Sequence, residues 1–290
     1  MKQRFQSMLF PGGKTRAMTF SYDDGVLQDK RLIEMFDKYG VKGTFNLNYG
    51  MFGRQTPAGA PFDTTVFYKE EIAEVYKNHE IGGHSYHHSN LPTAGEARAM
   101  WEIIEDRRAL EELTGRIIRM YAHPFGTHTK AIDEMLRLAG YVGARSVVST
   151  HSFDVPEDFI MLDPTCHHGD PKLMELAEKF CTTSARDGRL FYVWGHAYEF
   201  DKDDNWDVME KLLAYVTQYK EDIWFATNTE IIDYVTAYRR LVYSADSSRI
   251  YNPSAIPVFV GIPDRGHYKP TPIWRVVEIA PGETADTAED

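Results

Sequence analysis

The sequence predicts an α/β protein built as a distorted (β/α) barrel of about seven strands, with a short, mostly β C-terminal extension. Short apolar runs alternate with longer amphipathic segments up to about residue 243. Strands separated by helices pair in parallel through right-handed crossovers. Seven or eight such units favour a closed or nearly closed barrel over an open sheet. Beyond residue 244 the chain is rich in proline and β-branched residues and has no helical pattern.

The expected strands are short apolar runs, the first of them RAMTFSY at residues 16–22. The others lie at residues 43–48, 80–85, 116–124, 141–147, 159–162, 189–196 and 223–227. Helices are expected at residues 29–40, 68–78, 93–115, 128–140, 170–182, 206–220 and 229–241. In the longest of them Thr93 and Glu96 have capping-box spacing, and Gly115 is a stop signal. We therefore assign residues 1–243 to the barrel and residues 244–290 to an extension of short strands with a frayed acidic end.

Composition narrows the function. The chain has 290 residues and a formal net charge of -11, and it lacks the basic stripe that nucleic-acid binding needs. Its two cysteines form no CxxC pair, which favours a reducing compartment. No apolar run reaches about 18 residues and no signal peptide is evident, so we expect a cytoplasmic protein without a membrane span. The oligomeric state is left open.

Polar residues follow several predicted strands. Asp23 and Asp24 end the first strand, His84 ends the third, Pro124-Phe125-Gly126 ends the fourth, and His196 ends the strand at 189–196. Ligands of parallel α/β folds bind beyond the carboxyl ends of the strands. We therefore expect these groups to converge on one rim.

His84 and His88 are four residues apart, a spacing found in metal sites. Two imidazoles and one carboxylate suit Zn²⁺ or a similar ion and leave positions open for water and substrate. The histidine pair alone is a weak signal, but the strand-end Asp23-Asp24 pair strengthens it. Neighbours on an extended chain point to opposite sides, so one aspartate would reach the metal and the other the substrate. The alternative for the pair is capping of the following helix.

These motifs resemble the polysaccharide deacetylases of carbohydrate esterase family 4, which contain the NodB-homology domain. The matching segments, in order over residues 16–240, are TFSYDDG (residues 19–25, with two residues inserted before the Asp pair), HSYHH (84–88), PFG (124–126) and the strand-end His of YVWGH (192–196). The resemblance implies that Asp23 is the general base and His196 the general acid. It also implies that Asp24, His84 and His88 bind a divalent metal, first Zn²⁺, with Co²⁺ or Ni²⁺ as alternatives, and that the Phe125 N–H assists at the oxyanion.

Two positions depart from the family pattern. Ala122 and His123 stand where many members carry an arginine that orients the base; Arg145 could substitute, whereas Arg119 should face the other way. The aspartate that supports the acid histidine has no clear match, and its candidates are Asp154, Asp158 and Asp163.

The remaining candidates form a substrate-binding group. Phe125, Tyr86, Tyr198, Trp194 and Trp206 could stack on a sugar ring, although most aromatic residues are core. We expect His87 to be a loop side chain, His167 and His168 to lie at the surface, and Glu199 and Asp201 to be solvated.

The sequence thus predicts a metal-dependent deacetylase acting on an N- or O-acetylated carbohydrate or a small acetylated substrate. Loops 50–65, 148–169 and 198–206 are expected to shape its cleft. One alternative is an amidohydrolase on the same fold that cleaves a cyclic imide or ureide. The other is a carbohydrate-binding protein with a degenerate site. The substrate and the choice between N- and O-acetyl stay open.

Overall fold

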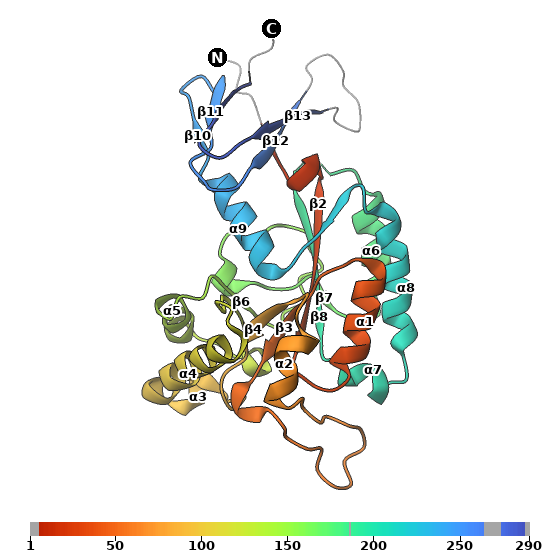
Figure 1. Ribbon diagram of the computed structural model, residues 1–290. Coiled ribbons are helices and arrows are strands. Elements are labelled where there is room, and N and C mark those ends of the chain that lie inside the picture. Colours follow the sequence, from red (N-terminus) through yellow and green to blue (C-terminus); the bar gives the residue numbers. More distant parts are fainter. Residues whose placement is uncertain (1–5, 186, 264–273, 288–290) are drawn as a thin grey trace.

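A parallel sheet lies at the centre of the protein in the computed structural model, which describes residues 6–185, 187–263 and 274–287 (Figure 1). Its strands are β2 (Arg16–Asp23), β3 (Thr44–Leu47), β4 (Glu80–Gly83), β5 (Met120–Ala122), β6 (Gly143–Arg145), β7 (Cys166–His167), β8 (Arg189–Gly195) and β9 (Ile223–Phe225). Their order is β6-β5-β4-β3-β2-β8-β7, and β9 pairs in parallel with the first residues of β2. The parallel sheet predicted from the sequence is confirmed.

The two ends of this row of strands are joined by the segment 162–167. Leu162 forms a parallel bridge with Arg145 of β6, while β7, a few residues later, pairs with β8. An irregular stretch therefore completes the ring, which gives the distorted barrel expected from the sequence.

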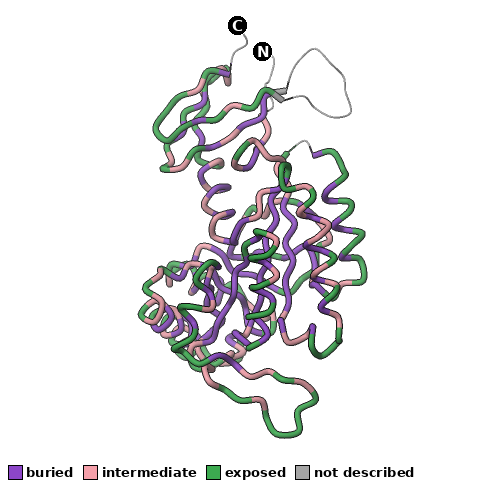
Figure 2. The backbone as a smooth tube through the Cα atoms, turned by 45° about the vertical axis from the view of Figure 1, so that its right-hand side comes forward, coloured by how far each residue is buried: buried purple, intermediate pink, exposed green. Residues whose placement is uncertain are grey.

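Helices surround the strands, and the most deeply buried part of the chain is the sheet itself (Figure 2). They are α1 (Asp29–Tyr39), α2 (Lys69–Val75), α3 (Leu91–Ala94), α4 (Glu96–Thr114), α5 (Lys130–Leu138), α6 (Leu173–Thr182), α7 (Tyr198–Lys202), α8 (Trp206–Val216) and α9 (Asn228–Arg239). Short 3₁₀ turns lie at Pro11–Gly13, Tyr49–Met51, Pro124–Gly126, Phe159–Met161 and Thr217–Tyr219. In α1, Leu32 and Phe36 are fully buried. Burying such a side chain stabilises the fold by about 1.5–3 kcal/mol.

The two faces of β2 explain where the first aspartate points. Phe20 and Tyr22 pack on Phe36 of α1, with ring centroids 4.8 and 6.1 Å away. Alternate residues of a strand face opposite sides, so Ser21 and Asp23 face the barrel interior. This pleat places the carboxylate of Asp23 at the inner rim of the barrel.

The C-terminal extension is a set of short antiparallel strands, as predicted. It contains β10 (Val242–Tyr243), β11 (Arg249–Tyr251), β12 (Val258–Pro263), β13 (Trp274–Ile279) and β14 (Thr284–Asp286). The N-terminal strand β1 (Ser7–Leu9) pairs with β12, so both ends of the chain contribute to it. The predicted frayed end falls partly on β14, which is an ordered strand, and partly on residues 288–290, which lie outside the described residues.

Two local predictions are wrong. The helix expected at 93–115 is broken at Gly95, whose φ of 80° and ψ of 149° are not helical. The Thr93 hydroxyl donates to the Asn90 carbonyl at 3.0 Å, so the Thr93–Glu96 capping box does not form. The expected strand at 159–162 is instead a 3₁₀ turn, because the Asp158 carboxylate accepts the backbone N–H of Ile160.

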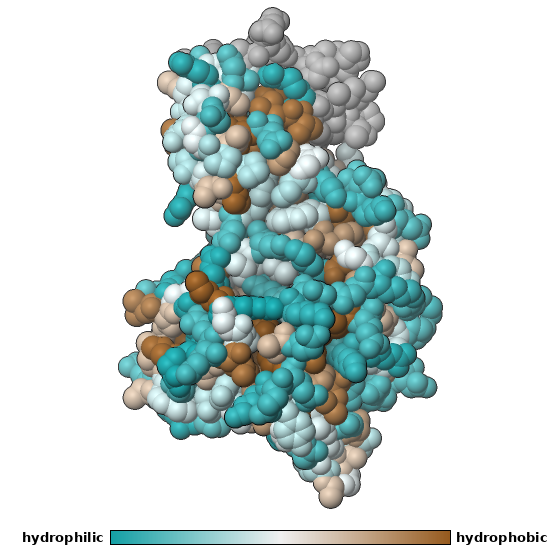
Figure 3. Space-filling view, viewed as in Figure 1, coloured by the Kyte–Doolittle hydropathy of each residue, from teal (hydrophilic) through white to brown (hydrophobic). Residues whose placement is uncertain are grey.

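The surface facing the viewer in Figure 3 is mostly hydrophilic, with apolar residues in scattered patches. Within the described ranges, no helix combines the length and apolar character needed to cross a membrane.

Candidate active site

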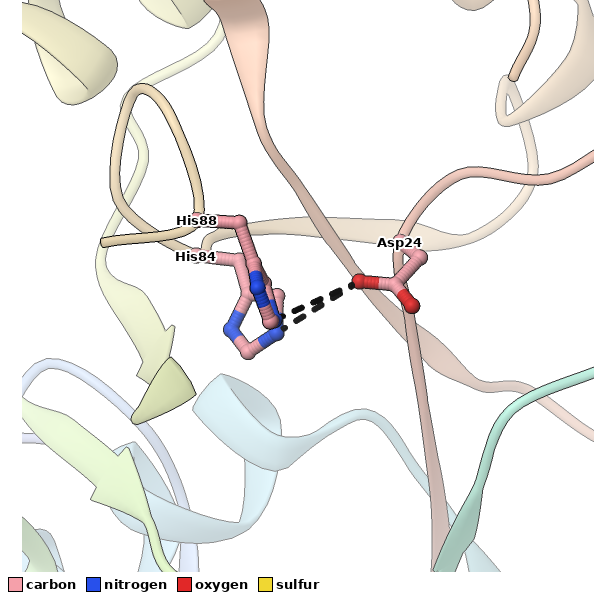
Figure 4. Close-up of side chains that lie close together, drawn as sticks. All are labelled: Asp24, His84 and His88. Atoms are coloured by element: carbon pink, nitrogen blue, oxygen red, sulfur yellow. Dashed lines mark ion pairs between the residues drawn. The ribbon is translucent and has the colours of Figure 1, made fainter. Parts of the chain in front are cut away.

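Three predicted metal ligands lie together at the carboxyl end of the sheet. Asp24 Oδ1 is 3.8 Å from His84 Nε2 and 3.7 Å from His88 Nε2 (Figure 4). Atoms that both lie about 2.1 Å from one tetrahedral ion are roughly 3.4 Å apart. The spacing is thus too long for hydrogen bonds but suits three ligands of a shared divalent cation.

The strand ends between the two aspartates, and this brings both to the same place. Asp24 has a φ of 79° and Gly25 a φ of 65°, so the chain turns there instead of staying extended. As a result Asp23 Oδ2 also lies 3.9 Å from His84 Nε2. The expectation that the two carboxylates point to opposite sides, which assumed an extended backbone, is therefore wrong.

Both histidines direct Nε2 toward Asp24. His84 Nδ1 lies 2.8 Å from the Ala122 carbonyl, so Nδ1 carries the hydrogen and the Nε2 lone pair is free. Burial, and next the neighbouring His84, lower the pKa of His88 to about 4. A metal ligand must be deprotonated, and His88 meets this condition at neutral pH.

Helix α4 holds the loop that carries these histidines. The fully buried Asp106 accepts the backbone N–H of His84 at 3.0 Å, and Glu102 accepts that of His87 at 2.8 Å. Glu102 also lies 3.1 Å from His87 Nδ1, which keeps His87 on the α4 side. Sequence reasoning missed Glu102 and Asp106, although two acids one turn apart on a helix face that is otherwise apolar were a signal.

Asp23 is a buried carboxylate with fixed partners. Asn46 Nδ2 donates to Asp23 Oδ1 and to Ser21 Oγ, each at 2.8 Å, and the Arg145 guanidinium donates to Asp23 Oδ2. Burial alone would raise the pKa of Asp23, but Arg145, with help from His84, holds it well below its usual range. Asp23 is therefore ionised at neutral pH.

Arg145 is the last residue of β6. This strand lies beside β5, whose end leads to Ala122 and His123, where many family members carry an arginine. The Arg145 side chain is fully buried, and its guanidinium lies 4.4 Å from the centroid of the Trp194 ring. Arg119 instead pairs with Asp233 of α9 at 2.7 and 2.8 Å. Of the two arginines weighed in the sequence, Arg145 is the one that reaches Asp23.

His196 lies across the rim from the metal ligands. Its Nε2 is 3.9 Å from Asp23 Oδ2, and its Nδ1 is 3.3 Å from Glu199 Oε2. Burial alone would lower the pKa of His196, but Glu199, Asp23 and Asp24 raise it to about 9. The imidazole is accordingly protonated at neutral pH.

The expectations that Glu199 is solvated and that His168 lies at the surface are both wrong. The Glu199 side chain is 19% exposed and lies 2.9 Å from His167 Nε2 and 3.4 Å from His168 Nε2, so it is not a solvated loop residue. His168 is buried rather than at the surface.

The three aspartates considered as supports for His196 have other partners: Asp154 accepts from Ser152, Asp158 from the N–H of Ile160, and Asp163 from Ser146.

Part of the sequence is similar to a known protein family. Residues 11–144 match the sequence profile of the polysaccharide deacetylases. This part of the chain belongs to the polysaccharide deacetylase family. The matched segment contains the predicted metal ligands and Asp23, whereas His196 lies beyond it. No curated protein matches the sequence.

A solved structure extends the likeness in fold beyond residues 11–144. A Mycobacterium smegmatis protein assigned to the polysaccharide deacetylases is 18% identical, with a TM-score of 0.60 over 82% of this chain and 96% of its own. A family 4 carbohydrate esterase from Streptomyces lividans, solved with acetate, is 13% identical, with a TM-score of 0.46 over 73% of this chain and 91% of its own. At these identities the first likeness concerns the fold, and the second is weaker still.

The aromatic residues predicted to bind substrate occupy different settings. Phe125 is 60% exposed, and its ring centroid lies 4.5 Å from that of His88. Tyr198 lies 5.2 Å from the His196 ring and stacks on Phe62 of the 50–65 loop at 5.5 Å. These two residues border the site.

The other aromatic candidates pack elsewhere. Trp194 is buried over Arg145, and Trp206 is buried 4.7 Å from Phe200. Tyr86 packs on Trp101 at 5.2 Å and on Tyr49 at 5.6 Å, toward α4. A sugar ring therefore has less access to these three side chains than to Phe125 and Tyr198.

Proposed function

We propose that this chain is a metal-dependent hydrolase that removes acetyl groups from an N- or O-acetylated carbohydrate. One observation carries the proposal: Asp24, His84 and His88 are spaced as ligands of one ion, and the ionised Asp23 and protonated His196 lie beside them. Hydrolysis of an amide or ester needs an activated water, a polarised carbonyl and a protonated leaving group. The rim offers residues for all three.

The donor set fits zinc best, because two neutral imidazoles and one carboxylate form an open three-ligand site. Cobalt or nickel could bind the same atoms. A cation held there would polarise the acetyl carbonyl and lower the pKa of a bound water. The finding that His84 is already fixed by the Ala122 carbonyl supports this assignment, because metal-binding histidines generally donate their second N–H.

Asp23 takes the proton of the attacking water in this proposal. Asn46 and Arg145 hold its carboxylate in place, so it can receive the proton without turning away from the rim. His196, with Nε2 3.9 Å from Asp23, gives a proton to the departing amine or alkoxide. The backbone N–H of Phe125, whose ring packs against His88, would add a donor for the oxyanion.

Acetate release is the direct test. Chitin oligomers, acetylxylan and small N-acetyl sugars are incubated with the metal-loaded protein, then with chelator-treated protein, and finally with protein to which zinc, cobalt or nickel is returned. We expect release that chelator abolishes and metal restores. Hydrolysis of a cyclic imide or ureide without acetate release would favour the amidohydrolase alternative, and sugar binding without turnover would favour the degenerate binding protein.

A further inference from the structure

Three imidazoles converge on one carboxylate behind the proposed acid. Glu199 Oε2 lies 2.9 Å from His167 Nε2, 3.4 Å from His168 Nε2 and 3.3 Å from His196 Nδ1. It also accepts the backbone N–H of His196 at 3.0 Å, while the Glu199 N–H donates to the His196 carbonyl at 3.1 Å. Glu199 is thus hydrogen-bonded to the His196 backbone, and its carboxylate lies beside the His196 ring.

The group is a cluster of ion-pair contacts rather than a second metal site. His167 Nδ1 accepts the Gly169 N–H at 3.0 Å, so the hydrogen of this ring is on Nε2, which faces Glu199. A nitrogen that carries a hydrogen cannot bind a metal. The 2.9 Å contact is also a hydrogen-bond length, unlike the 3.7 Å and 3.8 Å spacings around Asp24.

The surroundings keep Glu199 in place. His167 belongs to β7, where it lies opposite Trp194 of β8 in the parallel register. His168 is 2% exposed and stacks against Tyr22, at 5.6 Å, and against Phe200, at 4.1 Å. Since packed histidines border the carboxylate, its orientation toward His196 is set by the fold.

We infer that Glu199 is a positioning residue for His196: it holds the ring by Nδ1, so that Nε2 faces Asp23 and the leaving group. This inference rests on the proposed function, in which His196 is the acid. The 3.3 Å contact is not aligned as a hydrogen bond. Such catalytic contacts often tighten only when substrate is bound.

Substrates with different leaving groups can distinguish the positioning role of Glu199 from general damage to the fold. An amine or alkoxide must be protonated as it departs, whereas 4-nitrophenolate leaves readily without a proton. A variant that loses the orientation of His196 should therefore fail on N-acetyl sugars and still hydrolyse 4-nitrophenyl acetate. A variant with a damaged site should lose both activities together.

The test compares Glu199→Gln with Asp201→Asn. The glutamine keeps an oxygen that can accept the His196 N–H but loses the charge, and Asp201 is an acid of the same short helix α7 whose partner is Trp206 Nε1 at 2.7 Å. We expect Glu199→Gln to lower kcat on an N-acetyl substrate on the order of 10- to 100-fold. Its zinc content and its rate on 4-nitrophenyl acetate should change little, and Asp201→Asn should resemble wild type in all three measurements.

Equal losses on both substrates, or no loss on the N-acetyl substrate, would overturn the inference. If wild type hydrolyses no acetyl compound, the proposed function fails, and the nitrogen chemical shifts of the His196 ring, recorded in wild type and Glu199→Gln, still decide the positioning role. A protonated Nδ1 in wild type that changes in the variant supports it. Identical shifts in both proteins would refute it.

Discussion

Replacing Arg145 with methionine should unpair the buried carboxylate of Asp23. The two side chains are 0% and 3% exposed. Removing one partner of such a pair costs about 3–5 kcal/mol, because the other charge stays buried without compensation. The lost contact with the Trp194 ring adds to this cost, while the Asn46 hydrogen bond at 2.8 Å offsets part of it. We therefore expect Arg145→Met to lower the free energy of unfolding by about 3–5 kcal/mol.

Unfolding of the metal-free protein in guanidinium chloride, followed by circular dichroism, measures this loss. Arg119→Met is the matched control, because its pair with Asp233 is 34% and 45% exposed and should be worth only about 0–1 kcal/mol. The double variant Asp23→Asn/Arg145→Met removes both charges. It should be about 1–3 kcal/mol more stable than the sum of the single losses predicts.

Two results would refute this reasoning. One is an Arg145→Met loss no larger than that of Arg119→Met. The other is strict additivity in the double variant, which would mean that the two buried side chains do not depend on each other.

Three further predictions concern the metal ligands, the substrate and pH. Asp23→Asn should abolish acetate release and keep zinc, whereas Asp24→Asn should lose both; zinc loss in both variants, measured by elemental analysis, would mean that the roles are exchanged. Phe125→Ala should raise KM about 2- to 10-fold if the exposed ring stacks on the sugar, and an effect on kcat alone would contradict this. Burial, more than any other influence, lowers the pKa of His79 below its ordinary 6.5. As the pH falls, His79 therefore binds a proton in the unfolded chain before it does so in the folded protein. The free energy of unfolding accordingly decreases as the pH drops below about 6.5. His79→Gln should flatten that fall, seen as a smaller Tm difference between pH 7 and pH 5; an unchanged difference would show that His79 does not contribute.

The alternation of strands and helices was readable because local patterns control it. Strands such as β2 and β8 lie in apolar runs, and helices such as α1 bury one apolar stripe. The same rule located the candidate site, since polar residues that end parallel strands meet at one edge. His84 and His88 were found in this way without knowledge of any contact.

Other features depend on contacts between distant parts of the chain. Arg145 and Asp23 are 122 residues apart, and no local spacing predicts that they meet. The position of Glu199 was hidden for a similar reason: three residues after His196 it was expected to be a solvated loop residue, and only the approach of β7 brings His167 against it. Backbone torsions were equally unreadable, as the turn at Asp24 and the break at Gly95 show.

The sequence by itself determined the barrel, the rim and the residue types at its strand ends, because hydrophobic periodicity and strand-end placement follow from short-range rules. Only the tertiary structure decided which arginine pairs with Asp23, which acid faces His196 and which aromatic rings stay exposed. Those choices follow from burial and charge pairing, which arise when separate elements pack together and which no single segment specifies.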